Sequence, residues 1–452
     1  MTEHLSTICG RLVALLRIDA WPSASMSLAG SLILFSTTSS ADPSAHTTAK
    51  FMGTGSCSSS NCHGGVNPLS GSTVLQNEYH TWQKLDRHAQ AYSVLLNDDS
   101  KKIANHLGIE RPEAEPLCLK CHATYVPSVE QQGPKYQVED GVSCESCHNP
   151  SEHWLKSHST KGATHEENVK NGLAELVPLE KRATLCLSCH FGTEDKTVNH
   201  RLYGAGHPRL AFELDTFGVL QPKHWVIDED YRTRKADYVP VAAWLVGQTT
   251  HAIATLEALE SPTRSKHGLM PELSLFDCYS CHHSLTEDQW KQRDYSGKPG
   301  ELTLNLPSLY ILREALPALD SDLADELKDK LSELHNFSTS PSTGGDIRSV
   351  TSPLKALLHE KILPLALAAQ SDATYCKKLL KQLATFGAHS GALKYEVAEQ
   401  VGMGMQALLA SSPDLATKHK GHLDVVFAAL KSSEAFNTAS FTEGCKKLAS
   451  SL

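Results

Sequence analysis

The final third of the chain alternates apolar and polar positions with a helical period. Between residues 317 and 335, leucines recur every four positions, at Leu319, Leu323, Leu327 and Leu331. This spacing places them on one face of an amphipathic helix. Similar runs predict further helices over residues 354–369, 374–386, 393–411, 416–431 and 441–452. We therefore expect residues 301–452 to form an α-helical domain, a bundle that supports the rest of the protein or mediates assembly.

One stretch interrupts this pattern. Residues 337–353 are rich in Ser, Thr, Gly and Pro, a composition typical of linkers and mobile loops. The sequence therefore predicts a flexible loop there.

The region from residue 51 to residue 300 has a different pattern. No alternation of apolar and polar residues persists long enough to predict a sheet. The sequence predicts longer helices at residues 81–95 and 240–259. For the rest of this region it predicts short helices and loops rich in Gly and Pro. The predicted fold class is mainly α with little regular structure in this region.

The N-terminal residues resemble an export signal. Arg11 and Arg17 precede an apolar stretch at residues 26–35, and Ser39-Ser40-Ala41 resembles a cleavage site with small residues. We expect a signal peptide at residues 1–41 and a polar leader at 42–50. An uncleaved anchor is the alternative, but the apolar stretch is short for a membrane span. No other segment is long and apolar enough to cross a bilayer, so we expect no membrane span in the mature chain.

Five cysteine pairs in the region 51–300 are each followed directly by a histidine. Two thiols at this spacing can add to the vinyl groups of one haem, and the adjacent imidazole then binds the iron. Four motifs have the form C-x-x-C-H, and the first has a four-residue spacer of Ser and Asn, which suit a wider turn. The motifs are Cys57/Cys62/His63, Cys118/Cys121/His122, Cys144/Cys147/His148, Cys186/Cys189/His190 and Cys278/Cys281/His282.

Zinc sites and disulfides are the alternatives for these cysteine pairs. Zinc sites use C-x-x-C pairs too, but they need a second ligand pair and do not require a histidine directly after the second cysteine. A disulfide framework does not explain the histidines either. We therefore expect five covalently attached haem c groups in residues 51–300. Their apolar macrocycles would supply buried surface to a chain with only 6% aromatic residues. Covalent haem attachment takes place outside the bacterial cytoplasm, which with the export signal predicts a periplasmic protein.

The net charge and the cysteines outside the motifs limit the binding partners and disulfides that we expect. The formal net charge is −9, and haem propionates would make the protein more acidic, which argues against nucleic acid and fits a redox partner protein. Three cysteines lie outside the motifs, at Cys9, Cys376 and Cys445. The last two can form a disulfide in an exported protein or remain separate buried thiols.

Among the 24 histidines, some are candidates for the second axial position of an iron. His88 follows Trp82 in an expected helix, and His153 lies five residues after a motif histidine. His207 is flanked by glycines that allow a close approach to a macrocycle and by Pro208, which stiffens the turn. His251, beside apolar residues of an expected helix, is a further candidate. Below these rank His80, His158, His224 and His283. Either other histidines complete the set, or one iron lacks a distal ligand from the protein.

Three segments resemble the cytochrome c554 family of multihaem cytochromes. They are residues 82–92, residues 144–153 and Gly206-His207-Pro208, and the resemblance extends over about residues 51–292. It implies a mostly helical periplasmic protein with stacked and perpendicular haem pairs, which carries electrons in the oxidation or reduction of nitrogen compounds. It also implies that His88, His153 and His207 bind haems other than their sequence neighbours. The chain departs from the family in having five motifs rather than four and a longer first spacer.

Two functions follow from the coordination of the irons. Five irons with two protein ligands each would make an electron carrier, which is the preferred interpretation. An iron with an open position would make an oxidoreductase acting on a small nitrogen or sulfur oxyanion or a related compound, such as nitrite, hydroxylamine or nitric oxide. Arg209 or Tyr203 could then serve the substrate, although structural or propionate-binding roles are favoured for both. No motif ends in Lys, as the catalytic motif does in pentahaem nitrite reductases. Whether the C-terminal helices make an oligomer is open.

Overall fold

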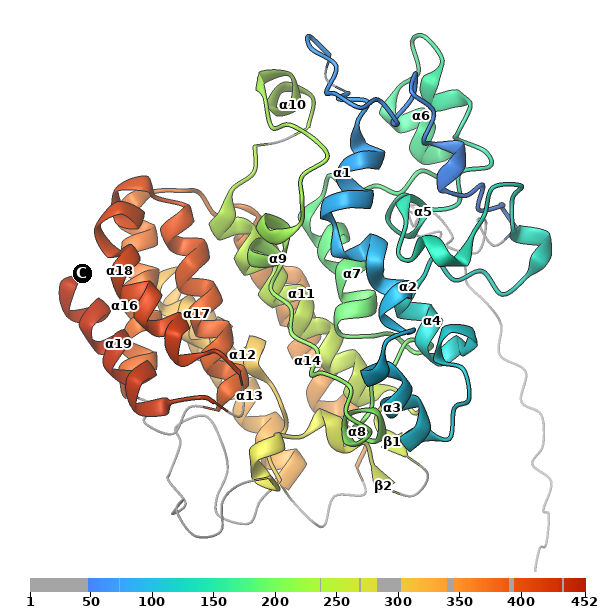
Figure 1. Cartoon of the computed structure of the whole chain (residues 1–452). Helices are drawn as coiled ribbons and strands as arrows, with labels where there is room; N and C mark the ends of the chain where they lie inside the picture. The colour runs from blue at the N-terminus through green and yellow to red at the C-terminus, as the bar shows by residue number, and fades with distance from the viewer. Residues whose placement is uncertain are drawn as a thin grey trace, which may run out of the picture. The chain divides into compact units, whose positions relative to one another are not determined.

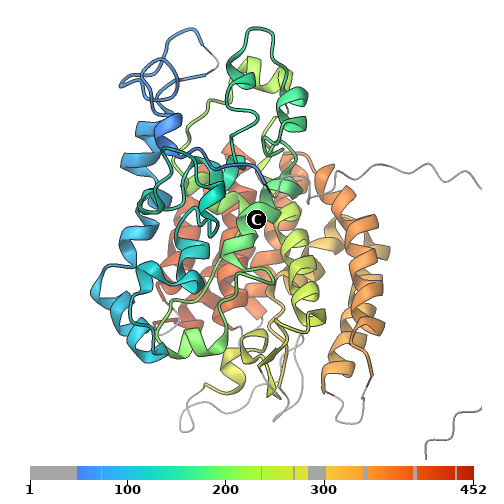
Figure 2. The same cartoon turned by 90° about the vertical axis from the view of Figure 1, so that its right-hand side faces the viewer.

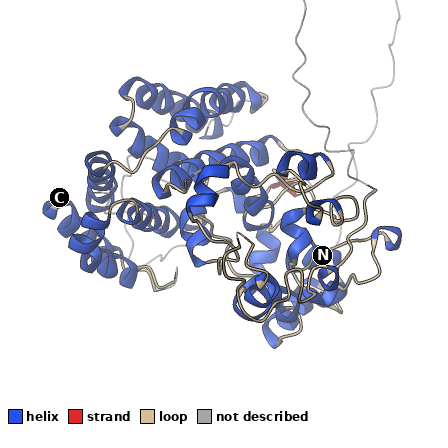
Figure 3. Cartoon of the chain, turned by 90° about the horizontal axis from the view of Figure 1, so that it is seen from above, coloured by secondary structure: helices blue, strands red, loops and turns tan. Residues whose placement is uncertain are grey.

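Helices dominate the structure and strands are nearly absent, which confirms the predicted fold class (Figure 3). The computed structural model describes residues 48–72, 74–235, 237–267, 270–282, 302–339, 345–389, 394–432 and 435–452. The expected signal peptide, most of the leader, Cys9 and His283 lie outside these ranges. A single hairpin of two-residue strands, β1 (Lys266–His267) and β2 (Met270–Pro271), is the sheet in the part described.

The first half of the structure consists of short helices joined by loops. Side-chain caps begin many of them: Asn97 accepts the Ser100 N–H at 2.8 Å, and Thr164 and Glu167 form a capping box. The helices are α1 (Glu78–Leu85), α2 (Ala91–Val94), α3 (Asp98–Leu107), α4 (Pro116–His122), α5 (Cys144–His148), α6 (His165–Lys170), α7 (Leu179–His190), α8 (His200–Gly204), α9 (Leu214–Leu220) and α10 (Glu229–Arg234).

The expected helix over residues 81–95 is divided in two. Helix α1 ends at Leu85, and a 3-10 turn at Arg87–Gln90 precedes α2. The break lies at Asp86, which has an extended backbone and whose carboxylate accepts the His88 N–H at 3.0 Å. Aspartate competes for backbone donors in this way and therefore favours caps over helix interiors.

Helix α11 (Pro240–Glu260), expected at residues 240–259, is the central element. Sixteen of its 21 residues are buried. It packs against α7 and α9 on one side and against helices of the C-terminal part on the other, so it separates the blue and green N-terminal helices from the red ones (Figure 1). Glycines allow two of these contacts, because a Cβ at Gly247 would lie 2.7 Å from Leu214 and one at Gly404 would lie 2.8 Å from the Trp244 ring.

The C-terminal helices form as the leucine pattern predicts. Leu327, Leu331 and Leu334 of α13 are buried, and α13 packs beside α14, where both appear in orange in Figure 2. The helices are α12 (Pro307–Ala315), α13 (Ser321–Thr339), α14 (Arg348–Leu357), a π-helical turn (Leu358–Ile362), α15 (Leu363–Leu367), α16 (Ala373–His389), α17 (Tyr395–Ala410), α18 (Pro413–Ala429) and α19 (Thr438–Ser451). Among the helices that the structure describes, none has the length and apolar character needed to cross a membrane.

The flexible loop predicted at residues 337–353 is wrong at residues 337–339 and 348–353, which are helical. Helix α13 continues to Thr339, and α14 begins at Arg348 and includes Pro353. Burial of Thr351 and Leu354 accounts for the helix, and the Thr351 hydroxyl donates to the Glu260 carboxylate at 2.6 Å. Composition alone did not reveal this tertiary contact.

Cys376 and Cys445 are separate buried thiols. The Cys445 sulfur lies 2.6 Å from the position that a Cβ of Gly387 would occupy. Gly387 follows Cys376 in α16 by about three helical turns, or roughly 16 Å. This separation exceeds the reach of a disulfide, so the disulfide alternative is wrong.

Candidate haem-binding sites

The five motifs occupy helix ends and tight turns. The second, third and fourth motifs end α4, α5 and α7, so one helical turn places both cysteines and the histidine close together. The first motif follows the 3-10 turn Thr54–Ser56, and the fifth begins with the 3-10 turn Cys278–Ser280. All ten motif cysteines are free of disulfides.

Cys62 and Cys281 are more exposed to solvent than we expect for motifs that surround buried macrocycles. Both side chains are exposed, as is Cys278, whereas the six cysteines of the three helical motifs are half-buried. The reason is local, because Cys62 and Cys281 lie in turns at the surface instead of at the end of a packed helix. The Cys62 sulfur lies 3.9 Å from the Asn61 side chain of its own spacer. The thioether bonds of Cys62 and Cys281 remain a prediction. The exposure of these two cysteines places one edge of the first motif and one edge of the fifth motif at the surface.

Each motif histidine faces the ring of a second histidine from a distant part of the chain. The distances between ring centres fall in a narrow range, from 6.2 to 6.4 Å. The pairs, with the motif histidine first, are His63–His158, His122–His207, His148–His224, His190–His88 and His282–His200. We number these sites 1 to 5 in the order of the motifs.

This spacing fits one iron between the two rings of each pair. A metal–nitrogen bond of about 2 Å, added to about 1.2 Å from the nitrogen to the ring centre and doubled, gives about 6.4 Å. All five separations agree with this sum. The residues present therefore fit haem groups with two histidine ligands each.

Hydrogen bonds orient several of these imidazoles. An Nδ1 that donates to an oxygen leaves Nε2 as the nitrogen for a metal and fixes the ring plane. Two of the acceptors are carboxylates, Glu78 and Asp86, which also make the ligand more basic. The Nδ1 contacts are His63 to Glu78 at 3.0 Å, His88 to Asp86 at 2.9 Å, His122 to the Ala91 carbonyl at 3.0 Å, His158 to the Trp154 carbonyl at 3.1 Å and His207 to the Pro208 carbonyl at 2.8 Å.

Burial keeps other members of the pairs neutral. Loss of hydration lowers the pKa of His148 and of His190 to about 4, and it also lowers the pKa of His207 and His224. The neutral imidazole is the form that binds a metal. These rings are therefore in the ligating state at neutral pH.

Comparison with known proteins covers the first three motifs. Residues 56–149 match the family model of cytochrome c554 and c-prime. This segment belongs to the cytochrome c554 family. The match assigns this segment to the c-type cytochromes, a class that binds haem covalently and transfers electrons. A search of curated proteins and a search of solved structures each gave no match.

The c554 segment contains Cys57 through His148, whereas the fourth and fifth motifs and all the facing histidines except His88 lie outside it. The structure brings two of the expected distal candidates, His88 and His207, opposite motif histidines. In the described residues it does not do so for the other two. His153 is 59% exposed and lies 4.0 Å from Glu152, while His251 packs on the Phe191 ring at 4.8 Å.

The other three facing histidines are His158 and His224, which the sequence placed below the main candidates, and His200, which it did not suggest. An aromatic neighbour was an available signal for two of them. The Trp154 ring lies 5.3 Å from His158, and the Trp225 ring lies 5.0 Å from His224. For His200 the local sequence offers only Asn199, which caps α8.

The proximity of motif cysteines shows which of the five sites are neighbours. The Cys57 thiol lies close enough to Cys144 to change its pKa, and Cys121 lies similarly close to Cys189. With haem attached these sulfurs would be thioethers, so the contacts mark proximity only. Site 1 therefore adjoins site 3, and site 2 adjoins site 4. Cys147 of site 3 also lies near Cys186 and Cys189 of site 4.

Arg209 and Tyr203, the candidate substrate residues, have structural partners. The Arg209 guanidinium lies 2.6 Å from Glu399 and 3.9 Å from Glu396, and it stacks over Tyr395 at 5.1 Å. Burial raises the pKa of Tyr203, and the nearby Leu210 backbone opposes this rise. The favoured structural interpretation therefore suits both residues.

Proposed function

We propose that this protein is a periplasmic electron carrier with five haem c groups, each held between two histidines. The observation that carries the proposal is the set of five histidine pairs at the spacing of a metal–bis-imidazole unit. The ten motif cysteines, the exposed Cys62 and Cys281 included, would form the thioether bonds. The iron would supply reversible one-electron transfer between its ferrous and ferric forms.

The two histidine ligands of each iron determine which reactions it can carry out. Two imidazoles per iron leave no position for a substrate, and their hydrogen bonds hold both rings in place during a change of charge. The alternative function, an oxidoreductase with an open iron, requires a motif histidine with no facing ligand. No specific observation favours it, since each of the five motif histidines faces a second ring.

The arrangement of sites supports a continuous route for electrons. The cysteine contacts give the order 1, 3, 4 and 2. Helix α8 begins with His200 of site 5 and is followed by His207 of site 2, so the fifth site lies beside the second. The acidic net charge of −9 suits a basic redox partner protein. The c554 likeness supports a place in nitrogen-compound respiration.

Electron paramagnetic resonance of the oxidised protein tests the proposal. The imidazole planes of sites 1 and 5 differ by 10° and 31°, while those of sites 2, 3 and 4 differ by 86°, 81° and 90°. Near-parallel planes give rhombic low-spin signals, and near-perpendicular planes give highly anisotropic ones. We expect two of the first kind, three of the second and no high-spin signal.

Two further measurements complete the test. Mass spectrometry of the purified protein should show five haem additions, and the reduced protein should not bind nitric oxide. A high-spin signal that disappears on addition of nitrite or nitric oxide would show an open iron and favour the oxidoreductase. Four haem additions would mean that one motif, with Cys57 and Cys62 the first to examine, is not a site.

A further inference from the structure

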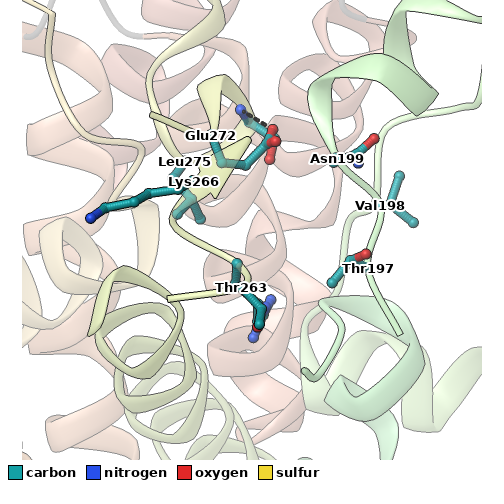
Figure 4. Close-up of a pocket in the computed structure, with 9 residues that line it drawn as sticks. Thr197, Val198, Asn199, Thr263, Lys266, Glu272 and Leu275 are labelled. Atoms are coloured by element: carbon teal, nitrogen blue, oxygen red, sulfur yellow. Dashed lines mark hydrogen bonds between the residues drawn. The ribbon is translucent and has the colours of Figure 1, made fainter. Parts of the chain in front are cut away.

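A small pocket lies between the segments that build sites 4 and 5. Figure 4 shows Thr197, Val198 and Asn199 along one wall and Thr263, Glu272 and Leu275 along the other. Asn199 directly precedes His200, the facing histidine of site 5. Glu272 accepts the His200 N–H at 2.7 Å and so joins the two walls. Anything bound here would contact the surroundings of the fifth site.

Arg264, which also lines the pocket, is a cation held next to site 4. Its guanidinium stacks over the ring of Phe191 at 4.9 Å, and an Nη atom donates to the Phe191 carbonyl at 3.3 Å. Phe191 directly follows His190. These two contacts fix the position of the guanidinium, but neither brings a negative charge to balance it.

No carboxylate in the described part of the chain lies within 4.0 Å of the Arg264 guanidinium. Its nearest acidic neighbours, Glu194 and Glu257, act from a greater distance. The Thr263 hydroxyl donates to Glu194, and the Ser261 hydroxyl lies near enough to lower the pKa of that carboxyl. Burial lowers the pKa of Arg264 in spite of these acids. A half-buried cation in this setting gains stability from an additional anion.

We propose that Arg264 is the binding residue for a haem propionate, supplied by the haem of site 4 or of site 5. The inference rests on the proposed function, because it needs haem at those sites. A carboxylate matches the planar fork of the guanidinium, which can donate two parallel hydrogen bonds. The propionate would complete the charge balance of the pocket, and Thr197 and Thr263 offer hydroxyl groups along its walls.

The pairing would set the potential of the haem concerned. Reduction removes one positive charge from the iron, so a nearby cation stabilises the reduced form. Loss of Arg264 would remove that cation and leave the propionate charge unbalanced. Both effects lower the midpoint potential.

The test compares Arg264→Met with the wild-type protein in a redox titration followed by electron paramagnetic resonance. We expect the potential of one haem to fall by about a tenfold change in its reduction equilibrium, which is about 59 mV for one electron. Arg264→Lys keeps the charge without the fork and should give a smaller fall. Lys361→Met is the matched control, because it removes a positive charge that pairs with Glu326 on the surface of the C-terminal helices.

The signal that moves identifies the source of the propionate. Of the two sites beside Arg264, a shift of a highly anisotropic signal assigns the propionate to site 4, whose planes are at 90°, and a shift of a rhombic signal assigns it to site 5, at 31°. Potentials that match those of Lys361→Met, or that change with added phosphate in the wild-type protein, would overturn the inference. Five haems by mass spectrometry with unchanged potentials would refute this pairing alone, whereas a missing haem would refute the proposed function.

Discussion

A buried ion pair ties the C-terminal helices to the fifth motif, and its removal is the sharpest test of how that motif is held. The Lys394 ammonium lies 2.5 Å from an Asp277 carboxylate oxygen, and the side chains are 4% and 1% exposed. Asp277 directly precedes Cys278, and Lys394 directly precedes α17. Replacement of Lys394 by Met keeps a long unbranched side chain and removes only the charged group.

The expected loss of stability follows from the burial. Removal of one partner from a buried pair costs about 3–5 kcal/mol, because the other charge stays buried and loses its counter-ion. The Ser280 hydroxyl donates to the same Asp277 oxygen at 2.9 Å and offsets part of this cost. We therefore expect a loss of about 3 kcal/mol for Lys394→Met. The double variant with Asp277→Asn removes both charges of the pair and should recover most of that loss.

Guanidinium denaturation followed by far-ultraviolet circular dichroism measures these differences. Lys361→Met again serves as the control, since its ion pair with Glu326 is 52% and 37% exposed and should contribute less than about 1 kcal/mol. The rhombic signal of site 5 should broaden or shift in Lys394→Met but not in the control. Equal stability of Lys394→Met and Lys361→Met, or a double variant less stable than the single one, would refute the reasoning.

Two further predictions concern the facing ligands and the buried carboxylates. His158→Ala should leave the iron of site 1 with one protein ligand and produce a high-spin electron paramagnetic resonance signal from one haem. His153→Ala should leave that spectrum unchanged. The reverse result would show that the pairing at site 1 is wrong. Burial raises the pKa of Glu213 to about 7, so in the folded chain Glu213 binds a proton that the unfolded chain releases above about pH 4.5. Stability should therefore fall by up to about 3 kcal/mol as the pH rises from about 4.5 to about 7 and then level off. Glu213→Gln should flatten this fall in denaturation curves, and an unchanged slope would contradict the assignment.

The sequence predicts the helical elements well where an apolar face repeats and less well where a single contact decides. Helix α11 and the leucine-rich helices form as expected, because burial of a regular apolar face outweighs other preferences. The division at Asp86 depends on one side chain that accepts a backbone N–H. The helix across Pro353 depends on the burial of Thr351 against Glu260. Neither contact leaves a periodic trace in the sequence.

The same distinction applies to the sites. The cysteines and motif histidines are adjacent in sequence, so their chemistry can be predicted without a structure. The exposure of Cys62 and Cys281 cannot be predicted in this way. His88 and His207 could be predicted as candidate ligands, but the motif that each facing histidine joins could not, because each lies far from that motif in the sequence and meets it only through the packing of loops. His200 has no local feature that distinguishes it, and its position follows from Glu272, which holds the start of α8 against the segment before Cys278.

The N-terminal part of α17 relates three of the sites to one another. Glu399 pairs with Arg209, two residues after His207 of site 2. Gln400 donates to the carbonyl of Phe212 at 3.1 Å, and the ring of Phe212 lies 5.3 Å from His190 of site 4. Lys394 binds Asp277 beside site 5. These contacts are directional and largely buried, so they specify one arrangement where apolar packing alone would tolerate several. Transfer of electrons between haems needs fixed distances, and we infer that the C-terminal helices serve the sites by fixing them.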